Sequence, residues 1–358
     1  MGRPSEPEIM QQGPKLNDYQ LTFLPATASD YDEVMSISGG IHDGVDYLPF
    51  RYHEWLAEPQ RRMFVARSEE KVVAFASFLL VDGGVTAVLQ GLRVAPWMRG
   101  RGIAREIQKF CFNTLRTNHP GVTKIRETVE ENVPPSLLSK SRLLHSKAVV
   151  SVFLPNDHLE KTTQLLSCRL LSVYQGRPPV PQSLSKVLRL LDDPRTAEDL
   201  FPKGVLIQDL LPLTTHKCNI ELLARWGIAW VYSKPSDLLT NPIEGANSSS
   251  ISNLSEHSTL SCTSSGFLSL STPPFPVPLE KGVYRLNIDL FGSNPSFAQA
   301  HILHHVTEAV RVLPPGGSIV CFVFAEETLR KPVMHYLHGM APFPAYRELL
   351  MLERTLEA

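Results

Sequence analysis

Apolar positions along the first half of the chain recur with strand-like and helix-like periods and predict an alternating order of elements. A first strand near 19–25 is followed by helices at about 31–38 and 46–58. Three strands come next, at 63–66, 72–81 and 85–95. The remaining expected elements are a helix over 102–118, a strand near 122–129, a helix near 136–145 and a closing strand over 149–154. This order predicts an α/β fold, with α and β elements around one mixed sheet.

The second half of the chain has a different pattern. Strands are expected at 205–211 and 228–232, with a helix over 219–226 between them. Residues 247–272 are dominated by Ser, Thr, Asn and Gly and predict a disordered insertion. The later elements are a strand over 284–291, a helix over 296–312, a strand over 318–324, a helix over 326–338 and a last strand over 346–352. The pattern divides the chain into a flexible tail (1–18), a first domain (19–155) and a second domain (156–358).

A short turn after the strand over 85–95 carries Arg99, Gly100, Arg101 and Gly102, and a helix follows at once. The first N–H groups of a helix lack intrahelical partners and carry partial positive charge, so they favour a bound anion. Glycine lets the backbone approach a bulky phosphate, and the arginines add charge. The spacing fits neither Gly-x-x-x-x-Gly-Lys-Ser/Thr nor Gly-x-Gly-x-x-Gly. A turn that uses glycine only for its geometry is the alternative interpretation.

The spacing Arg99-x-x-Gly102-x-Ala104 follows Leu-Arg-Val-Ala-Pro and precedes an amphipathic helix. It resembles the pyrophosphate-binding motif of the GCN5-related N-acetyltransferases (GNAT), Gln/Arg-x-x-Gly-x-Gly/Ala. Further stretches, at 30–41, 46–56, 91–97, 110–122 and 284–293, are similar to the histidine N-acetyltransferase subfamily, as in a diverged paralogue. The resemblance covers 23–152 well and the rest in parts. It implies an acetyltransferase fold for the first domain. The β-α-β-α-β order after residue 284 repeats the order of the first domain's second half, and the turn after Phe291 lacks the Arg-x-x-Gly-x-Ala signature. We therefore expect a second, degenerate acetyltransferase-like domain without a cofactor.

The resemblance also implies a donor site for acetyl-coenzyme A (acetyl-CoA) and no metal. The loop amides would hold the pyrophosphate, while the strand before the loop would offer a backbone N–H to the thioester carbonyl and pair with the pantetheine arm. The residues expected to bind the cofactor are Leu92, Arg93, Val94, Arg99, Gly100, Arg101, Gly102, Ile103 and Ala104.

The catalytic candidates are Gln90 and Glu127. Histidine-acetylating relatives carry glutamate at the positions of Ala76 and Gln90, and tyrosine at that of Ser141. Gln90 cannot ionise, but it can hold a water or a substrate amine. Glu127 follows the strand near 122 and could reach the amine, although a solvated acidic turn is the alternative.

Three residues are expected to bind the acceptor: Asp46, Tyr47 and Arg51. They lie in the helical region that lines the acceptor site in this fold, and Arg51 could pair with a carboxylate. Ordinary loop and helix polarity is the alternative for them. His301, His304 and His305 have a spacing that could bind metal, but a partly buried helix face is the favoured interpretation.

Bulk properties narrow the partners. The 358 residues carry a formal net charge of −1, with 43% hydrophobic and 20% charged residues. Such a balance favours neither nucleic acid nor an anionic membrane. The chain lacks an apolar run of about 18 residues, and its N-terminus lacks a signal-peptide core. The five cysteines form no Cys-x-x-Cys pair, so a cytoplasmic location is expected.

Two hypotheses follow. The first is an acetyl-CoA-dependent N-acetyltransferase that acts on the α-amine of a small amino acid, with L-histidine as the lead substrate, by direct transfer in a ternary complex. The alternative is a catalytically weak acyl-CoA-binding sensor or interaction protein.

Overall fold

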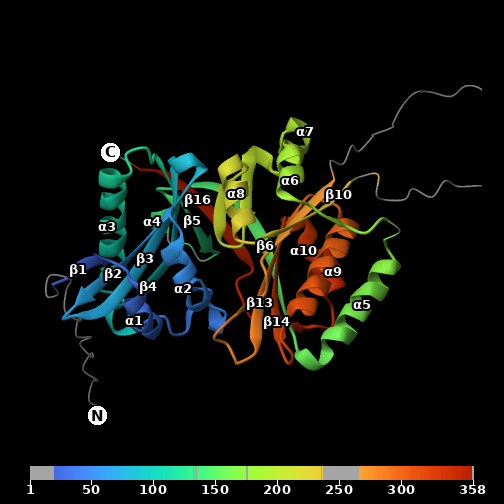
Figure 1. The fold of residues 1–358 in the computed structure, drawn as a ribbon, viewed down its shortest axis with the longest axis horizontal. Coiled ribbons are helices and arrows are strands. Elements are labelled where there is room, and N and C mark those ends of the chain that lie inside the picture. The colour runs from blue at the N-terminus through green and yellow to red at the C-terminus, as the bar shows by residue number, and fades with distance from the viewer. Residues whose placement is uncertain are drawn as a thin grey trace, which may run out of the picture.

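A computed structural model describes residues 20–356 apart from 132, 134, 175, 235 and 237–265. The expected tail (1–18) and most of the expected disordered insertion therefore lie outside the described residues. A 14-stranded mixed sheet runs across the described chain in the order β1-β2-β3-β4-β5-β16-β6-β14-β13-β11-β10-β7, with β12 and β15 paired beside this path (Figure 1).

The first half contains the elements that the hydrophobic pattern indicated, with one exception described below. They are β1 (Thr22–Pro25), α1 (Tyr31–Ser36), α2 (Leu48–Ala57), β2 (Arg61–Ser68), β3 (Lys71–Val81), β4 (Thr86–Val94), α3 (Ile103–Asn118), β5 (Lys124–Glu130), α4 (Pro135–Leu138) and β6 (Arg142–Leu154).

The second half adds helices around the other end of the sheet. In chain order its elements are α5 (Leu159–Leu171), β7 (Val180–Pro181), α6 (Leu184–Leu191), α7 (Pro194–Leu200), β8 (Val205–Gln208), β9 (Leu211–Thr214), α8 (Lys217–Arg225), β10 (Ala229–Ser233), β11 (Phe267–Ser271), β12 (Phe275–Pro276), β13 (Val283–Phe291), α9 (Pro295–Val312), β14 (Ser318–Ala325), α10 (Glu327–Tyr336), β15 (Ala341–Pro342) and β16 (Glu348–Thr355).

Two β-α-β units have the same connectivity but differ in how their strands pair. β4 and β5 are joined by α3 and pair in parallel only over 86–88 and 124–126. Their ladder ends there, so the strands separate towards the turn that carries Gly100 and Gly102. β13 and β14, joined by α9, pair without interruption over 283–289 and 318–324. Of these two units, only the first therefore has an opening between its parallel strands.

The C-terminal strand completes the sheet of the first half. β16 lies between β5 and β6 and pairs antiparallel with both. The helix expected at 136–145 is therefore wrong, because α4 ends at Leu138 and β6 already begins at Arg142. β16, more than 200 residues away in sequence, supplies the partner that makes this segment a strand, and such tertiary pairing overrides a local helical preference.

Two expectations in the second half are also corrected. The expected strand over 205–211 is a hairpin, with Asp209 at φ 53° in the turn between β8 and β9. Aspartate tolerates this left-handed conformation. Of the expected disordered insertion, residues 267–271 form the buried strand β11, paired with β10 and β13.

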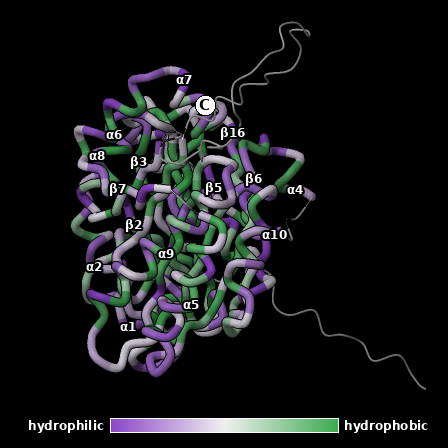
Figure 2. The backbone as a smooth tube through the Cα atoms, turned by 90° about the vertical axis from the view of Figure 1, so that its right-hand side faces the viewer, coloured by the Kyte–Doolittle hydropathy of each residue, from purple (hydrophilic) through white to green (hydrophobic). Residues whose placement is uncertain are grey.

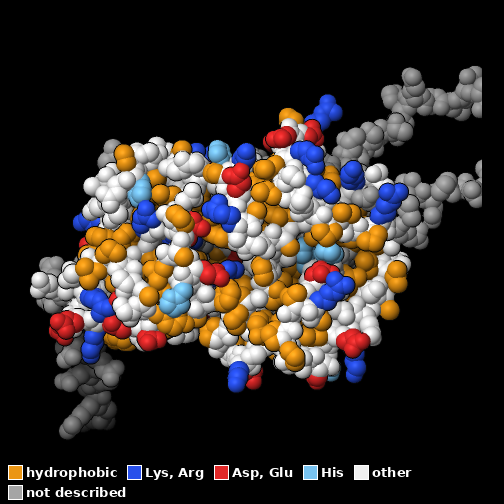
Figure 3. All heavy atoms as spheres, viewed as in Figure 1, with side chains coloured by type: hydrophobic (Ala, Val, Ile, Leu, Met, Phe, Trp, Pro, Cys, Tyr) orange, Lys and Arg blue, Asp and Glu red, His pale blue; other side chains and the backbone are white. Residues whose placement is uncertain are grey.

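The apolar positions meet in the interior. Hydrophobic segments of the backbone gather towards the middle of the molecule and hydrophilic ones towards its outside (Figure 2). β3 is buried along nearly its whole length, which requires cover on both faces of the sheet. Acidic and basic side chains are interspersed on the face in Figure 3, in keeping with the near-zero net charge. In the described part of the chain, no helix combines the length and apolar character that a membrane crossing requires.

Candidate functional site

Two cavities meet where the two halves of the chain face each other. One, of about 410 Å³, lies in the opening between β4 and β5 and is lined by Gly91, Leu92, Glu127 and others. The second, of about 510 Å³, lies between α2 and the segments around β9 and α8. Tyr47, Gln90 and Leu210 line both cavities. The two cavities are therefore neighbours that share part of their walls.

A bulge in β4 shapes the first cavity. Phe75 pairs with Arg93, whereas Ser77 pairs with Gln90, so β4 holds one residue more than β3 between these pairs. Gly91 adopts φ 73°, and a Cβ on it would lie 3.0 Å from Trp55 Cζ3. Because a bulge interrupts the ladder, the backbone at 91–92 lies outside the regular strand pairing beside this cavity, and the carbonyl of Leu92 accepts from Arg93 Nη1 at 3.0 Å.

The predicted phosphate loop has the geometry of an open helix N-terminus. Gly102 is the N-cap of α3 at φ 83°, and Gly100 lies at φ 74°. No side chain caps this helix. Arg99 is exposed, and its Nε donates to the carbonyl oxygen of Val94 at 3.2 Å, which ties the loop to the end of β4. Exposed N–H groups beside a basic side chain suit a diphosphate, so these residues fit the expected donor.

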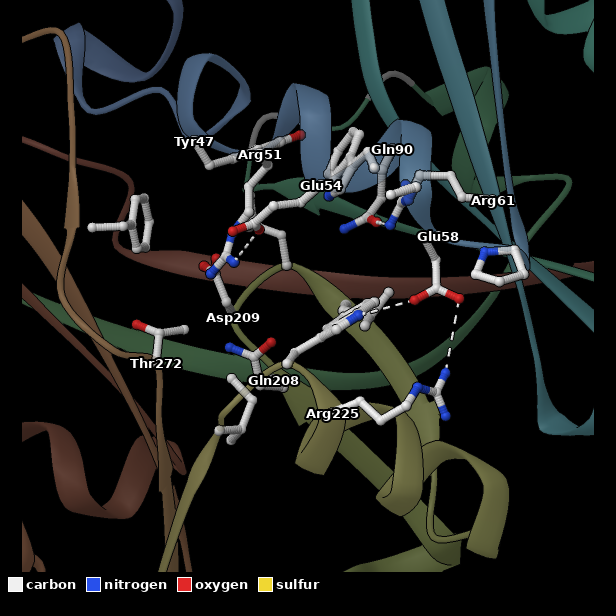
Figure 4. A pocket seen from close by; sticks show the side chains of 18 residues that line it. Tyr47, Arg51, Glu54, Glu58, Arg61, Gln90, Gln208, Asp209, Arg225 and Thr272 are labelled. Atoms are coloured by element: carbon white, nitrogen blue, oxygen red, sulfur yellow. Dashed lines mark hydrogen bonds and ion pairs between the residues drawn. The ribbon is translucent and has the colours of Figure 1, made fainter.

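The second cavity has walls from both halves of the chain (Figure 4). Glu58, just after α2, accepts a hydrogen bond from Trp226 Nε1 at 3.1 Å and lies 3.8 Å from Arg225 Nη2. These two contacts hold the end of α8 against the end of α2. The second cavity is thus built only when both halves are folded together.

Arg61 lies at the junction between the cavities. Its Nη2 donates to Gln90 Oε1 at 2.7 Å and its Nη1 to Ser77 Oγ at 3.1 Å. The guanidinium stacks 3.8 Å from the ring centre of Trp55. Burial lowers the pKa of Arg61 to about 9, partly offset by Tyr47 and Glu58. Gln90 is thereby fixed by its side-chain oxygen, which leaves its amide N–H groups to face the cavities.

A buried polar network supports the floor of the second cavity. Asp209 accepts from Arg285 Nη2 at 2.8 Å, and its backbone N–H donates to Asp289 Oδ2 at 2.9 Å. Arg285 also donates from Nε to Asn287 Oδ1 at 2.8 Å. Burial raises the pKa of Asp209, and the neighbouring Arg285 opposes that rise. Because Arg285, Asn287 and Asp289 alternate along β13, one strand of the second half holds the hairpin that lines the site.

Glu127 lines the first cavity from β5. Its carboxylate is 3.4 Å from Arg354 Nη2 on β16, and its Oε1 has no hydrogen-bond partner. Burial raises the pKa of Glu127, against the lowering effect of Arg354. Glu130 is more exposed and lies 3.7 Å from His42, which lowers its pKa. The structure therefore brings Glu127 and Gln90 to the same cavity.

The predicted acceptor residues are distributed differently. Tyr47 and Arg51 line the second cavity, where Arg51 Nη1 is 2.7 Å from Glu54 Oε2. Asp46 is instead buried and accepts from Arg93 Nη2 at 2.7 Å and from the Leu48 backbone at 3.0 Å. A predicted acceptor residue and a predicted donor residue are thus each other's partners. Their roles in binding stay predictions.

Comparisons with known proteins match this architecture. Residues 31–137 match the acetyltransferase (GNAT) family, and residues 175–243 and 246–326 match "Histidine N-acetyltransferase, C-terminal". The chain is 32% identical to "Probable N-acetyltransferase 16" of Homo sapiens, over 99% of this chain and 92% of that protein. It is 31% identical to "Histidine N-acetyltransferase" of Xenopus tropicalis, over 95% and 97%. The chain belongs to the histidine N-acetyltransferase family.

This member of the histidine N-acetyltransferase family is an N-acetyltransferase of GNAT type. A solved tandem GNAT protein from the clavulanic acid biosynthesis pathway has a TM-score of 0.54 to it at 14% identity, covering 95% of this chain and 99% of that chain. At such low identity the likeness shows the fold alone. The expected fold class, an acetyltransferase fold followed by a second acetyltransferase-like unit, is confirmed.

Sequence reasoning missed several cavity residues of this family member, among them Glu58, Arg61, Asp209 and Arg225. One signal was present in the sequence. Arg285, Asn287 and Asp289 alternate within an otherwise apolar strand, and charged side chains on a buried strand are uncommon unless they are paired. No comparable local pattern marks Arg61, because its partners come from two other strands.

Proposed function

We propose that this chain transfers the acetyl group of acetyl-CoA to the α-amine of a free amino acid, with L-histidine as the lead substrate. The observation that carries the proposal is the junction of two cavities at Gln90 and Tyr47. Donor and acceptor would occupy one cavity each and react directly in a ternary complex. Holding two reactants in register can contribute about 7–11 kcal/mol to lowering the barrier.

The first cavity and the loop that follows β4 are the proposed donor site. The N–H groups at the start of α3 and the Arg99 side chain would hold the diphosphate, with Gly100, Arg101, Gly102, Ile103 and Ala104 forming the cradle. Leu92, Arg93 and Val94 would present the backbone that pairs with the pantetheine arm. Acetyl-CoA supplies a thioester whose C–S bond breaks as the new N–C bond forms and whose thiolate then takes up a proton.

Gln90 and Glu127 are the proposed polar groups at the reacting centre. Gln90, held by Arg61, would orient the amine or a water beside it. Glu127 is the nearby carboxylate whose pKa is raised by burial, so it is a stronger base than an ordinary glutamate. It would accept the amine proton through a water. The α-amine of a free amino acid is mostly protonated at neutral pH, because its own carboxylate raises its pKa above that of a peptide N-terminus, so the reaction needs such a proton acceptor.

The histidine preference rests on the relatives and on the chemistry of the cavity wall. Three relatives are named Histidine N-acetyltransferase. Asp209 presents a carboxylate at the cavity, and Trp226 and Phe275 present aromatic surface. A carboxylate can accept from an imidazole N–H, while the aromatic rings pack against its face.

A catalytically weak acyl-CoA-binding protein is the second candidate. It is favoured by one observation, that the residue placed between the two cavities is Gln90, which cannot take up a proton. The two functions share the donor site and differ in turnover.

One experiment separates them. The protein is incubated with acetyl-CoA and a panel of free amino acids, and release of coenzyme A thiol is measured together with product mass. We expect turnover with histidine above the rest of the panel. Tight coenzyme A binding without thiol release for any amine would instead support the second candidate.

The donor site has its own test in Gly102→Asp. An aspartate at this N-cap places a carboxylate against the diphosphate, and φ 83° disfavours a side chain there. We expect coenzyme A affinity to fall at least 100-fold in calorimetry. Gly84→Ala, at φ 89° in the turn between β3 and β4, is the control for backbone strain alone. Normal binding by Gly102→Asp would show that the loop has been assigned wrongly.

A further inference from the structure

Arg61 is a buried cation at the second cavity that lacks an acidic partner among the described residues. The residue is 4% exposed. Its hydrogen-bond partners, Gln90 Oε1 and Ser77 Oγ, are both neutral, and its Nε has no partner. Among the described residues, no carboxylate oxygen lies within 4.0 Å of a side-chain nitrogen of Arg61, the distance that defines an ion pair.

The other arginines around this cavity are paired. Arg51 is 2.7 Å from Glu54, and Arg225 is 3.8 Å from Glu58. Arg285, beneath the cavity, is 2.8 Å from Asp209. Arg61 therefore differs from these neighbours, because none of the described carboxylates forms an ion pair with it and Glu58 acts on it only from farther away.

Burying a charge without an ion-pair partner costs free energy, because the charge loses its hydration. An anionic group of a bound ligand can supply that partner and offset the cost. With its pKa near 9, Arg61 remains protonated at neutral pH. The Trp55 ring, 3.8 Å away, holds the plane of the guanidinium in place through a cation–π contact. A guanidinium held in this way presents the planar donor fork that suits a carboxylate.

The position of Arg61 selects the ligand group. Its hydrogen-bonded neighbour Gln90 faces both cavities, so an anion beside Arg61 lies close to the path by which an amine reaches the first cavity. In an α-amino acid a single carbon separates the carboxylate from the amine. The diphosphate of the donor is assigned to the loop after β4 and does not compete for this arginine.

We propose that Arg61 binds the carboxylate of the acceptor and makes the enzyme selective for α-amino acids over simple amines. This inference rests on the proposed function and adds the group by which the acceptor is recognised. Arg51, the residue that the sequence suggested for this role, would contribute to the cavity wall with its charge already satisfied by Glu54.

The first test uses the unaltered protein. L-Histidine, histidinamide and histamine share the imidazole and a primary amine, but only histidine has a carboxylate. Loss of a buried charged partner costs a factor of about 30 or more in kcat/KM. We expect histidine to exceed both analogues by at least that factor, at matched concentrations of the neutral amine.

The second test uses variants of three arginines. Arg61→Gln should lower kcat/KM for histidine about 30-fold or more, chiefly through KM, and change that for histamine little. Arg51→Gln should lower it by a smaller factor. Arg62→Gln removes an adjacent exposed charge, bonded to backbone carbonyls, and should leave both substrates unaffected.

A third variant, Arg61→Lys, keeps the positive charge of the side chain and loses the planar donor fork. The ratio of histidine to histamine turnover should fall less than in Arg61→Gln, because an ammonium still attracts the carboxylate but offers it no paired N–H groups. This variant keeps the proposal testable where Arg61→Gln does not fold.

The outcomes are separable. Equal turnover of histidine and histamine by the unaltered protein overturns the carboxylate site but leaves acetyl transfer in place. Equal loss for both substrates in Arg61→Gln, or loss of selectivity in Arg51→Gln alone, overturns it as well. Absence of turnover with every amine in the panel counts against the proposed function itself.

Discussion

At the scale of single residues, Gly91 lets the bulge of β4 pack closely against Trp55 of α2 and Phe75 of β3. Gly91 has a φ of 73°, and a Cβ on it would lie 3.0 Å from Trp55 Cζ3 and 3.1 Å from Phe75 Cε1, which leaves no room for a side chain. We expect Gly91→Ala to lower the free energy of unfolding by about 1–3 kcal/mol and acetyl transfer by at least tenfold, since the bulge must shift. Urea unfolding and thiol release measure the two effects.

The matched control for Gly91→Ala is Gly84→Ala. Gly84 also has a positive φ, 89°, but a Cβ there would meet nothing within 4 Å. It should cost about 1–2 kcal/mol from strain alone and leave turnover unchanged. If Gly91→Ala behaves like this control, the bulge does not shape the reaction centre.

Single residues also show where sequence reasoning stops. The turn at Arg99 to Ala104 and the helix that begins after Gly102 could be predicted, because the residues that form them are adjacent in the chain, while their binding of a cofactor stays a prediction. Asp46 and Arg93 could each be placed near the site, but not paired with each other across 47 positions. Which charges neutralise one another depends on tertiary packing, so the lack of an ion-pair partner for Arg61 can be seen only in the folded structure.

At the scale of elements, α9 docks on the sheet through a chain of serine and histidine side chains. His301 bonds to Ser233 and Ser269, and His305 bonds to Ser269 and Ser271, at 2.7–3.0 Å. These bonds explain why the serine-rich strand β11 is buried. The Ser-rich composition predicted disorder there. Buried hydroxyls need hydrogen-bond partners, and composition alone does not reveal that α9 supplies them. His301 and His305 thus lie on a buried face of α9 and bond to serine, in agreement with the interpretation of these histidines as part of a partly buried helix face.

This docking predicts acid sensitivity. Burial lowers the pKa of His305 to about 3, against 6.5 for a free histidine. The unfolded chain therefore binds more protons between pH 3 and 6.5, and the free energy of unfolding falls as the pH falls through this window, by up to about 1.4 kcal/mol per unit for this group. His305→Gln should flatten that slope in urea titrations at pH 7, 6 and 5.

The control for His305→Gln is His338→Gln, because His338 is exposed at the end of α10. It should leave the pH slope as in the unaltered protein. A slope that is the same in all three proteins would show that His305 is not the group that loses its neutral state on acidification.

At the scale of the whole molecule, the end of the chain is part of the first domain's sheet. The boundary expected at residue 155 stays a prediction, but β16 pairs with β5 and β6 across it. Arg126 on β5 bonds to Glu353 on β16 at 2.9 Å and to Asp82 in the turn before β4 at 2.7 Å. Sequence order could not reveal this, because a strand pattern does not specify which strand it will join.

Deletion of residues 347–358 should therefore unfold the first domain, and not only shorten the second. β5 and β6 would become edge strands beside the positions of Leu349, Met351 and Leu352, all buried in the intact chain. Exposed strand edges promote aggregation. We expect an aggregated or unfolded product without coenzyme A binding, measured by light scattering and calorimetry.

A peptide of residues 346–356, added during refolding, should restore soluble protein by pairing between the two strands, whereas a scrambled peptide should not. A truncated chain that stays monomeric and binds coenzyme A normally would show that the proposed donor site forms without β16.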